Sequence, residues 1–183
     1  MNIIAFGASY SKDSINKQFA ENAARYFPEA HVEVLDLTEY PLPLFTVDIE
    51  KEIGIPENAI RFYHKLQSAD LIIISLAEHN GSYTAAFKNL FDWVSRHQPK
   101  MFDGKKVLLV STAPGPRGGL GVMGAARTRF PIHGAEIVGN FSLPKFSENF
   151  DTLNGITEPT LKEQFETVIA SVLDKISEPV LHN

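Results

Sequence analysis

The sequence predicts an α/β protein in which helices cover both faces of a doubly wound, five-stranded parallel sheet. Short apolar runs alternate with segments of helical period along the whole chain. Several of these runs are apolar at consecutive positions, which is typical of strands buried on both faces of a parallel sheet. No repeat, low-complexity tract or linker interrupts the series, so residues 1–183 are expected to form one domain.

The expected strands are the apolar or β-branched runs at residues 2–7, 31–36, 70–76, 106–112 and 136–141. The first helix is expected to follow Ser14, because serine favours the N-cap position and apolar residues recur at every fourth position after it. A later helix carries an apolar stripe at Phe87, Leu90, Phe91 and Val94. The next should run from about residue 118 to 130, since Pro131 disfavours helical backbone in its predecessor. Residues 161–176 form the last, amphipathic helix.

Right-handed crossovers leave few ways to connect these elements. The commonest doubly wound arrangement at this length has the flavodoxin-like strand order 2-1-3-4-5, whose switch point lies between strands one and three. Ligands bind there, beyond the carboxyl ends of the strands. The loops after strands one, three and four are therefore the expected site.

Composition narrows the chemistry that these loops can perform. The chain has no cysteine, which excludes thiol nucleophiles, iron–sulfur clusters and thiolate zinc sites, so redox chemistry needs a bound cofactor. A net charge of 17 − 22 = −5 without a dense basic face argues against nucleic acid or membrane as a partner. No apolar run approaches the roughly 20 residues of a membrane span, and the N-terminus resembles a strand rather than a signal peptide. The expected location is the cytoplasm.

The first loop, residues 7–16, contains Ser9, Ser11 and Ser14 before the expected helix. Serine hydroxyls and the N–H groups of a helix N-terminus are donors that can hold a phosphate. The spacing of a P-loop is missing, so nucleotide hydrolysis has no support. The alternative is that the serines only cap a helix and shape a turn.

The other two loops carry glycines that let backbone approach a flat ligand closely. The second contains the turn dipeptide Asn80-Gly81, which by itself indicates only a turn. The third, residues 111–119, is rich in glycine and proline and offers Arg117 as a cation, although an ordinary solvated loop is the alternative.

Other motifs point to no chemistry. A glycine pattern at 119, 121 and 124 lies too far after its strand for a dinucleotide fingerprint. There is no nucleophile elbow, and the histidine spacing matches no metal motif, so no metal is predicted.

Together the three loops resemble those of the NADPH-dependent FMN reductase family, flavodoxin-like quinone, chromate and azo-dye reductases. Its motif G-S-x-R-x-x-S-x-N matches residues 8–16, and P-E-Y-N-G-S-x-P-G-x-L-K-N-A-I-D-W matches residues 77–93. The third motif, S-T-x-P-G-x-x-G-G, matches residues 111–119, and the resemblance covers nearly the whole chain.

The resemblance implies bound FMN, with its phosphate in the first loop and its ring between the other two. The resemblance implies NADPH or NADH as the co-substrate and a quinone, azo compound, metal oxyanion or free flavin as the acceptor. It also implies that the protein assembles as a homodimer or homotetramer. His79 is a candidate proton donor to the reduced acceptor, because imidazole titrates near neutrality, or it packs beside the flavin. The implied cofactor-binding residues are Ser9, Ser11, Ser14, Ile15, Asn16, Glu78, His79, Asn80, Gly81, Thr112, Gly115 and Gly118.

The chain departs from the family pattern at several positions. Ser11 stands where an arginine is usual, which predicts weaker phosphate binding, and His79 replaces a tyrosine. Gly121 replaces an arginine that often follows the double glycine. Two other hypotheses therefore stay open, an electron carrier without enzymatic activity and a binding protein without cofactor. The segment 41–54 is expected to border the substrate pocket, a subunit interface or only its own domain.

Overall fold

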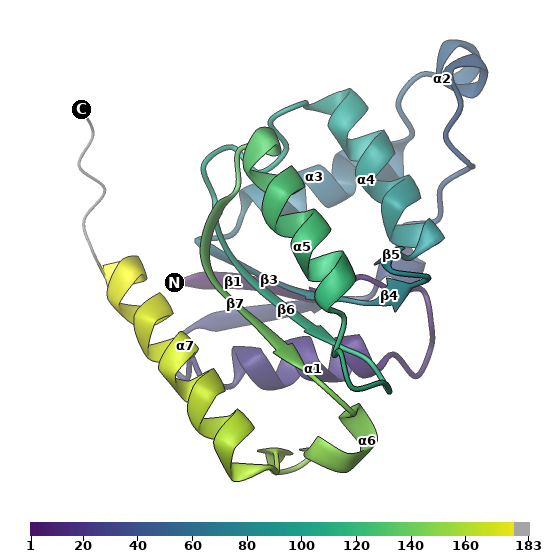
Figure 1. The fold of residues 1–183 in the computed structure, drawn as a ribbon. Coiled ribbons are helices and arrows are strands. Elements are labelled where there is room, and N and C mark those ends of the chain that lie inside the picture. Colours follow the sequence, from purple (N-terminus) through teal and green to yellow (C-terminus); the bar gives the residue numbers. More distant parts are fainter. Residues whose placement is uncertain (178–183) are drawn as a thin grey trace.

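The computed structural model describes residues 1–177 of the chain. Its main sheet has five parallel strands in the order β2-β1-β3-β6-β7 (Figure 1). Counting only these five, the order is 2-1-3-4-5, so the predicted topology is confirmed. The strands are β1 (Asn2–Gly7), β2 (His31–Leu35), β3 (Leu71–Leu76), β6 (Lys106–Thr112) and β7 (Glu136–Leu143).

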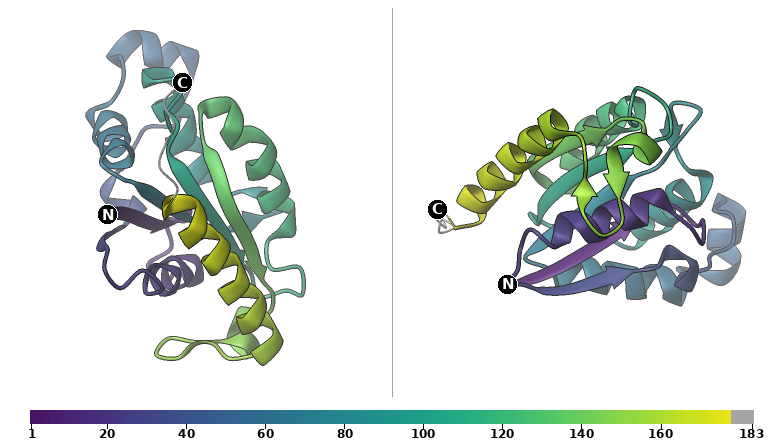
Figure 2. Two further views of the ribbon diagram at one scale, coloured as in Figure 1. Left: turned by 90° about the vertical axis from the view of Figure 1, so that its left-hand side faces the viewer. Right: turned by 90° about the horizontal axis from the view of Figure 1, so that it is seen from below.

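Helices cover both faces of the sheet, as expected (Figure 2). On one face α1 (Ile15–Ala24) and α7 (Pro159–Ser177) contribute Phe19 and Phe165 to a buried apolar layer. On the other face lie α3 (Glu57–Gln67), α4 (Ala85–His97) and α5 (Leu120–Arg129), with Phe62 and Trp93 in the core. All six residues of β3 are buried, which fits a central strand covered on both sides.

The helix predicted over residues 118–130 begins and ends differently in the structure. Gly118 and Gly119 have φ of +56° and +85°, values outside the helical region, so α5 starts only at Leu120. At its other end α5 gives way to a 3-10 helix, η2 (Phe130–His133), which has Pro131 in its first turn. Strand β7 extends to Leu143, beyond the predicted end at residue 141.

Several short elements were not predicted. They include the hairpin of β4 (Glu78–His79) and β5 (Ser82–Tyr83), and α2 (Val47–Ile53) within the segment 41–54. In Figure 1 α2 stands apart from the sheet, and none of its residues is buried. The others are η1 (Leu37–Glu39), α6 (Phe146–Asn149), β8 (Phe150–Asp151) and β9 (Gly155–Ile156). Within residues 1–177, no helix combines the length and apolar character that crossing a membrane requires.

Candidate functional site

A cleft of about 250 Å³ lies where the loops after β1, β3 and β6 meet. This is the edge of the sheet at which the sequence places the site. Eight of the twelve expected cofactor-binding residues line the cleft: Ser9, Ser11, Ser14, Ile15, Asn16, Glu78, His79 and Thr112. Its other lining residues are Asp13, Ala77, Ala113 and Pro114. Asn80, Gly81, Gly115 and Gly118 are not among the lining residues.

The first loop presents a set of hydrogen-bond donors to this cleft. Ser14 is the N-cap of α1, and its hydroxyl accepts a hydrogen bond from the Lys17 N–H at 3.1 Å. The N–H groups of Ile15 and Asn16 donate to no acceptor within residues 1–177. Such groups carry the partial positive charge of a helix N-terminus, so this end of the cleft suits an anion.

Asn16 connects the first loop to the other two. Its side-chain oxygen accepts hydrogen bonds from the Ser75 hydroxyl at 2.8 Å and the Thr112 N–H at 3.1 Å. Its side-chain nitrogen donates to the Thr112 carbonyl at 3.2 Å. All three residues are buried, so the carboxamide joins the start of α1 to the ends of β3 and β6.

Among the residues that the structure describes, negative but no positive side chains line the cleft. Asp13 and Glu78 line it, and no Lys or Arg is among its lining residues. Lys17, near the same loop, is paired with Asp36 at 2.7 Å. Hydrogen bonds from Lys17 and Thr38 lower the pKa of Asp36 to about 2. A phosphate in the cleft would therefore be held by hydroxyls and backbone dipoles rather than by a cation.

The second loop is a hairpin whose two strands have two residues each. Glu78 pairs with Tyr83 and His79 with Ser82, while Asn80 and Gly81 form the two-residue turn with φ of +52° and +77°. Asn-Gly between two strands is a strong hairpin signal, so the sequence contained the information for this element. The exposed His79 lines the cleft from this hairpin.

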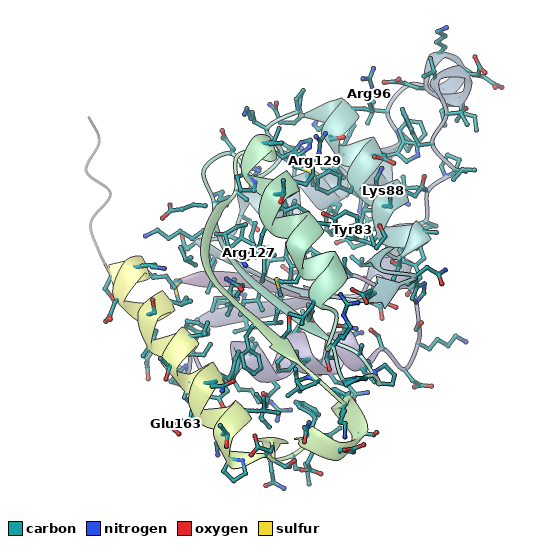
Figure 3. The ribbon with its side chains drawn as sticks, viewed as in Figure 1. Tyr83, Lys88, Arg96, Arg127, Arg129 and Glu163 are labelled. Carbon is teal, nitrogen blue, oxygen red and sulfur yellow. The ribbon has the colours of Figure 1, made fainter. Side chains whose placement is uncertain are left out.

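Tyr83, on the same hairpin, lines a second cavity of about 350 Å³ between α4 and α5. Figure 3 shows it with Lys88 of α4 and Arg129 of α5, which line the same cavity. Burial raises the pKa of Tyr83 to about 12, against the opposing effect of Arg129. The phenol is therefore neutral at physiological pH and belongs to this cavity rather than to the cleft.

The third loop is held by the segment that follows β7. The N–H groups of Lys145 and Phe146 donate to the carbonyls of Gly115 and Ala113 at 3.0 and 3.1 Å. A Cβ on Gly118 would lie 2.7 Å from the carbonyl carbon and oxygen of Leu143. Close approach of backbone to backbone therefore explains this glycine without a ligand contact.

Two further contacts between the loops were missed by sequence reasoning. The Thr84 hydroxyl caps α4 through the Phe87 N–H at 3.2 Å and donates to the Ala8 carbonyl of the first loop at 2.9 Å. The Glu78 carboxylate accepts a hydrogen bond from the Val122 N–H of α5 at 2.8 Å. In the sequence, Thr84 gave only the weak signal of a threonine before a helix.

Comparison with known proteins identifies the family to which this fold and these three loops belong. The family model described as NADPH-dependent FMN reductase matches residues 1–148. A quinone reductase of Escherichia coli K12 is 28% identical over 133 residues, covering 72% of this chain and 67% of the relative. An NADPH:quinone oxidoreductase of Arabidopsis thaliana is 29% identical over 150 residues, covering 79% and 74%.

Among solved structures, FerB, a flavoenzyme NAD(P)H:(acceptor) oxidoreductase from Paracoccus denitrificans, aligns with a TM-score of 0.75 over 96% of each chain. Its sequence is 19% identical, so this likeness supports the fold. The family model spans most of the chain and includes all three loops of the cleft. The chain therefore belongs to the NADPH-dependent FMN reductase family.

Proposed function

We propose that the protein is an NAD(P)H-dependent FMN oxidoreductase that passes electrons from a nicotinamide through bound FMN to a small acceptor. A quinone, an azo compound, a metal oxyanion or a free flavin fits the acceptor role. One observation carries the proposal: the serine hydroxyls of the first loop, and helix N–H groups that have no acceptor within residues 1–177, share a cleft with the loops after β3 and β6. Membership of the family supports it.

The residues of the cleft fit FMN by their chemistry. Ser9, Ser11 and Ser14, with the N–H groups of Ile15 and Asn16, form a donor set suited to a phosphate monoester. The small apolar side chains of the other two loops suit the face of a planar ring: Ala77, Ala113 and Pro114. The chemistry that FMN supplies when bound is acceptance of a hydride from the nicotinamide and return of two electrons to the acceptor.

The side chains of the protein bind and orient in this scheme, and none serves as a nucleophile. Within residues 1–177, His79 is the one imidazole that lines the cleft, and it is exposed on the hairpin. We propose that it packs beside the flavin, with proton donation to the reduced acceptor as its second candidate role. Comparison of the pH dependence of quinone reduction in the wild type and His79→Gln separates the two roles, because only proton donation shifts the profile.

Assembly and location extend the same proposal. Helix α2 exposes Val47 and Ile53, and Leu44, just before this helix, is 74% exposed. These exposed apolar side chains favour contact with a second copy of the chain in a homodimer or homotetramer. Sedimentation analysis tests this. The cytoplasm, where NAD(P)H is available as a reductant, is the proposed location, and cell fractionation tests it.

An anaerobic absorption spectrum tests the proposed activity directly. Purified protein reconstituted with FMN should lose its visible flavin absorbance on addition of NADPH or NADH, and a quinone should restore it with repeated turnover. A protein that binds no FMN would contradict the proposal and favour a binding role. Flavin that is reduced by one electron without turnover would indicate an electron carrier instead.

A further inference from the structure

Helix α5 begins without a cap from its own sequence. Its N-cap residue is Gly119, which has a left-handed backbone and no side chain to accept a hydrogen bond. The Val122 N–H, in the first turn of α5, instead donates to the Glu78 carboxylate at 2.8 Å. A carboxylate is favoured at this position because the helix N-terminus carries partial positive charge. Glu78 thus caps α5 from another loop, 44 residues away in sequence.

Gly121 leaves the space that this contact occupies. A Cβ at residue 121 would lie 2.6 Å from the nearer Glu78 carboxylate oxygen and 3.1 Å from the Gly81 carbonyl oxygen. A side chain there would displace the carboxylate or move the hairpin. The glycine that departs from the family pattern therefore has a structural reason, since it allows Glu78 to reach the backbone of α5.

The same contact joins two of the loops that form the cleft. Glu78 lines the cleft and begins the β4–β5 hairpin, which lies beside the start of α5 in Figure 1. The loop that leads into α5 contributes Ala113 and Pro114 to the cleft. A bond from Glu78 to α5 therefore fixes the hairpin relative to that loop.

We propose that Glu78 is a positioning residue for the flavin, which holds the hairpin against α5 through the Val122 N–H, with Gly121 as the residue that makes this contact possible. The inference rests on the proposed function, because it assigns the contact a role in binding FMN. It also places a carboxylate charge beside the cleft, where the end of a helix partly offsets it.

Four variants test the proposal: Glu78→Ala, Glu78→Gln, Gly121→Ala and the double variant Glu78→Ala/Gly121→Ala. FMN affinity is measured by quenching of flavin fluorescence, and the reduction potential of bound FMN by anaerobic titration. Glu78→Ala and Gly121→Ala should each weaken FMN binding by about fivefold, the effect of losing one capping bond. Glu78→Gln keeps an oxygen that can accept from the Val122 N–H, so it should bind FMN better than Glu78→Ala.

The double variant gives the sharpest result. If Gly121→Ala acts by displacing the carboxylate, it should cost little more once that carboxylate is removed, so the two effects should not add. Removal of the negative charge in Glu78→Gln should raise the reduction potential, which a purely structural role would not do. Gly124→Ala is the matched control, because a Cβ at Gly124, also in α5, meets nothing within 4 Å. It should leave FMN affinity unchanged.

Hydrogen exchange of the Val122 amide follows the contact itself without flavin. This amide should exchange faster in Glu78→Ala and Gly121→Ala than in the wild type. Additive effects of the two substitutions on FMN affinity, or an unchanged Val122 exchange rate in Glu78→Ala, would overturn the proposal. If the wild type binds no FMN, the proposed function fails. If the wild type binds FMN but the Val122 amide exchanges at the same rate in Glu78→Ala as in the wild type, only the role of Glu78 is overturned.

Discussion

Replacement of Asn16 by alanine tests the connection that holds the three loops together. The side chain is 3% exposed and makes three hydrogen bonds, two with the backbone of Thr112 and one with the hydroxyl of Ser75. Alanine at this position leaves the Thr112 N–H and the Ser75 hydroxyl buried without their acceptor, and the Thr112 carbonyl without the donor from Asn16. The substitution therefore measures a polar contact between buried groups.

The expected cost follows from the groups left unpaired. A buried donor without a partner costs about 1–3 kcal/mol, so the two donors alone give roughly 2–4 kcal/mol after some relaxation of the serine hydroxyl. For a chain of this length each kcal/mol lowers Tm by about 2–4 °C, which gives a decrease of roughly 4–16 °C. FMN affinity should fall as well, since the first loop loses its anchor.

Asn22→Ala is the matched control for this measurement. Asn22 lies on the same helix and is 6% exposed, but its side-chain oxygen has no hydrogen-bond partner within residues 1–177. Its replacement should cost less than about 1 kcal/mol, because no buried group loses a partner. Urea denaturation of the two variants with and without FMN compares them. Equal free energies of unfolding for Asn16→Ala and Asn22→Ala would refute the reasoning.

Three other substitutions test separate parts of the structure. Gly118→Ala should lower the free energy of unfolding by about 1–3 kcal/mol, because its φ is positive and its Cβ would meet the Leu143 carbonyl, and urea denaturation measures this. Asp13→Asn should tighten FMN binding by about threefold to tenfold, since it removes a negative charge from the cleft, while riboflavin binding stays the same. The pKa of Asp36 falls to about 2 on folding, so the Lys17 pair should stabilise the protein above about pH 4 and lose this effect toward pH 2. Unfolding free energies from pH 5 to pH 2 should thus decline more steeply in the wild type than in Asp36→Asn.

Each of these predictions has a result that contradicts it. A wild-type stability for Gly118→Ala would mean that the loop relaxes around the new methyl group. If Asp13→Asn changed FMN and riboflavin affinity equally, the explanation by charge repulsion between Asp13 and the FMN phosphate would be wrong. Asp174→Asn, an exposed change on α7, controls for net charge in that experiment. Identical pH profiles for the wild type and Asp36→Asn would remove the Lys17 pair as a source of stability.

The sheet and its edge could be predicted because the signals for them are local. Apolar runs indicate the strands. Right-handed crossovers leave few strand orders, and the commonest doubly wound order among them is the one that the structure confirms. Ser14 is the N-cap of α1 as predicted, since a serine before an apolar period is a local signal. Helix α2 has no apolar, buried face that would have indicated a helix in the sequence. None of its residues is buried, and it begins with the Thr46 cap and an acidic first turn instead.

The contacts that shape the cleft depend on residues far apart in the sequence. Asn16 meets Thr112 across 96 residues, and Glu78 meets Val122 across 44. These partners come together only once the sheet has set the positions of its loops, so no periodicity or spacing in the chain indicates them. The loops themselves could be located from the sequence, whereas the hydrogen bonds between them could not.

A crystal structure of the protein with FMN tests the central claim most directly. The phosphate should lie at the hydroxyls of Ser9, Ser11 and Ser14 and at the N–H groups that begin α1, with the ring between the hairpin and the loop after β6. Electron density for FMN at any other surface, or a cleft filled by rearranged side chains at saturating FMN, would contradict the account.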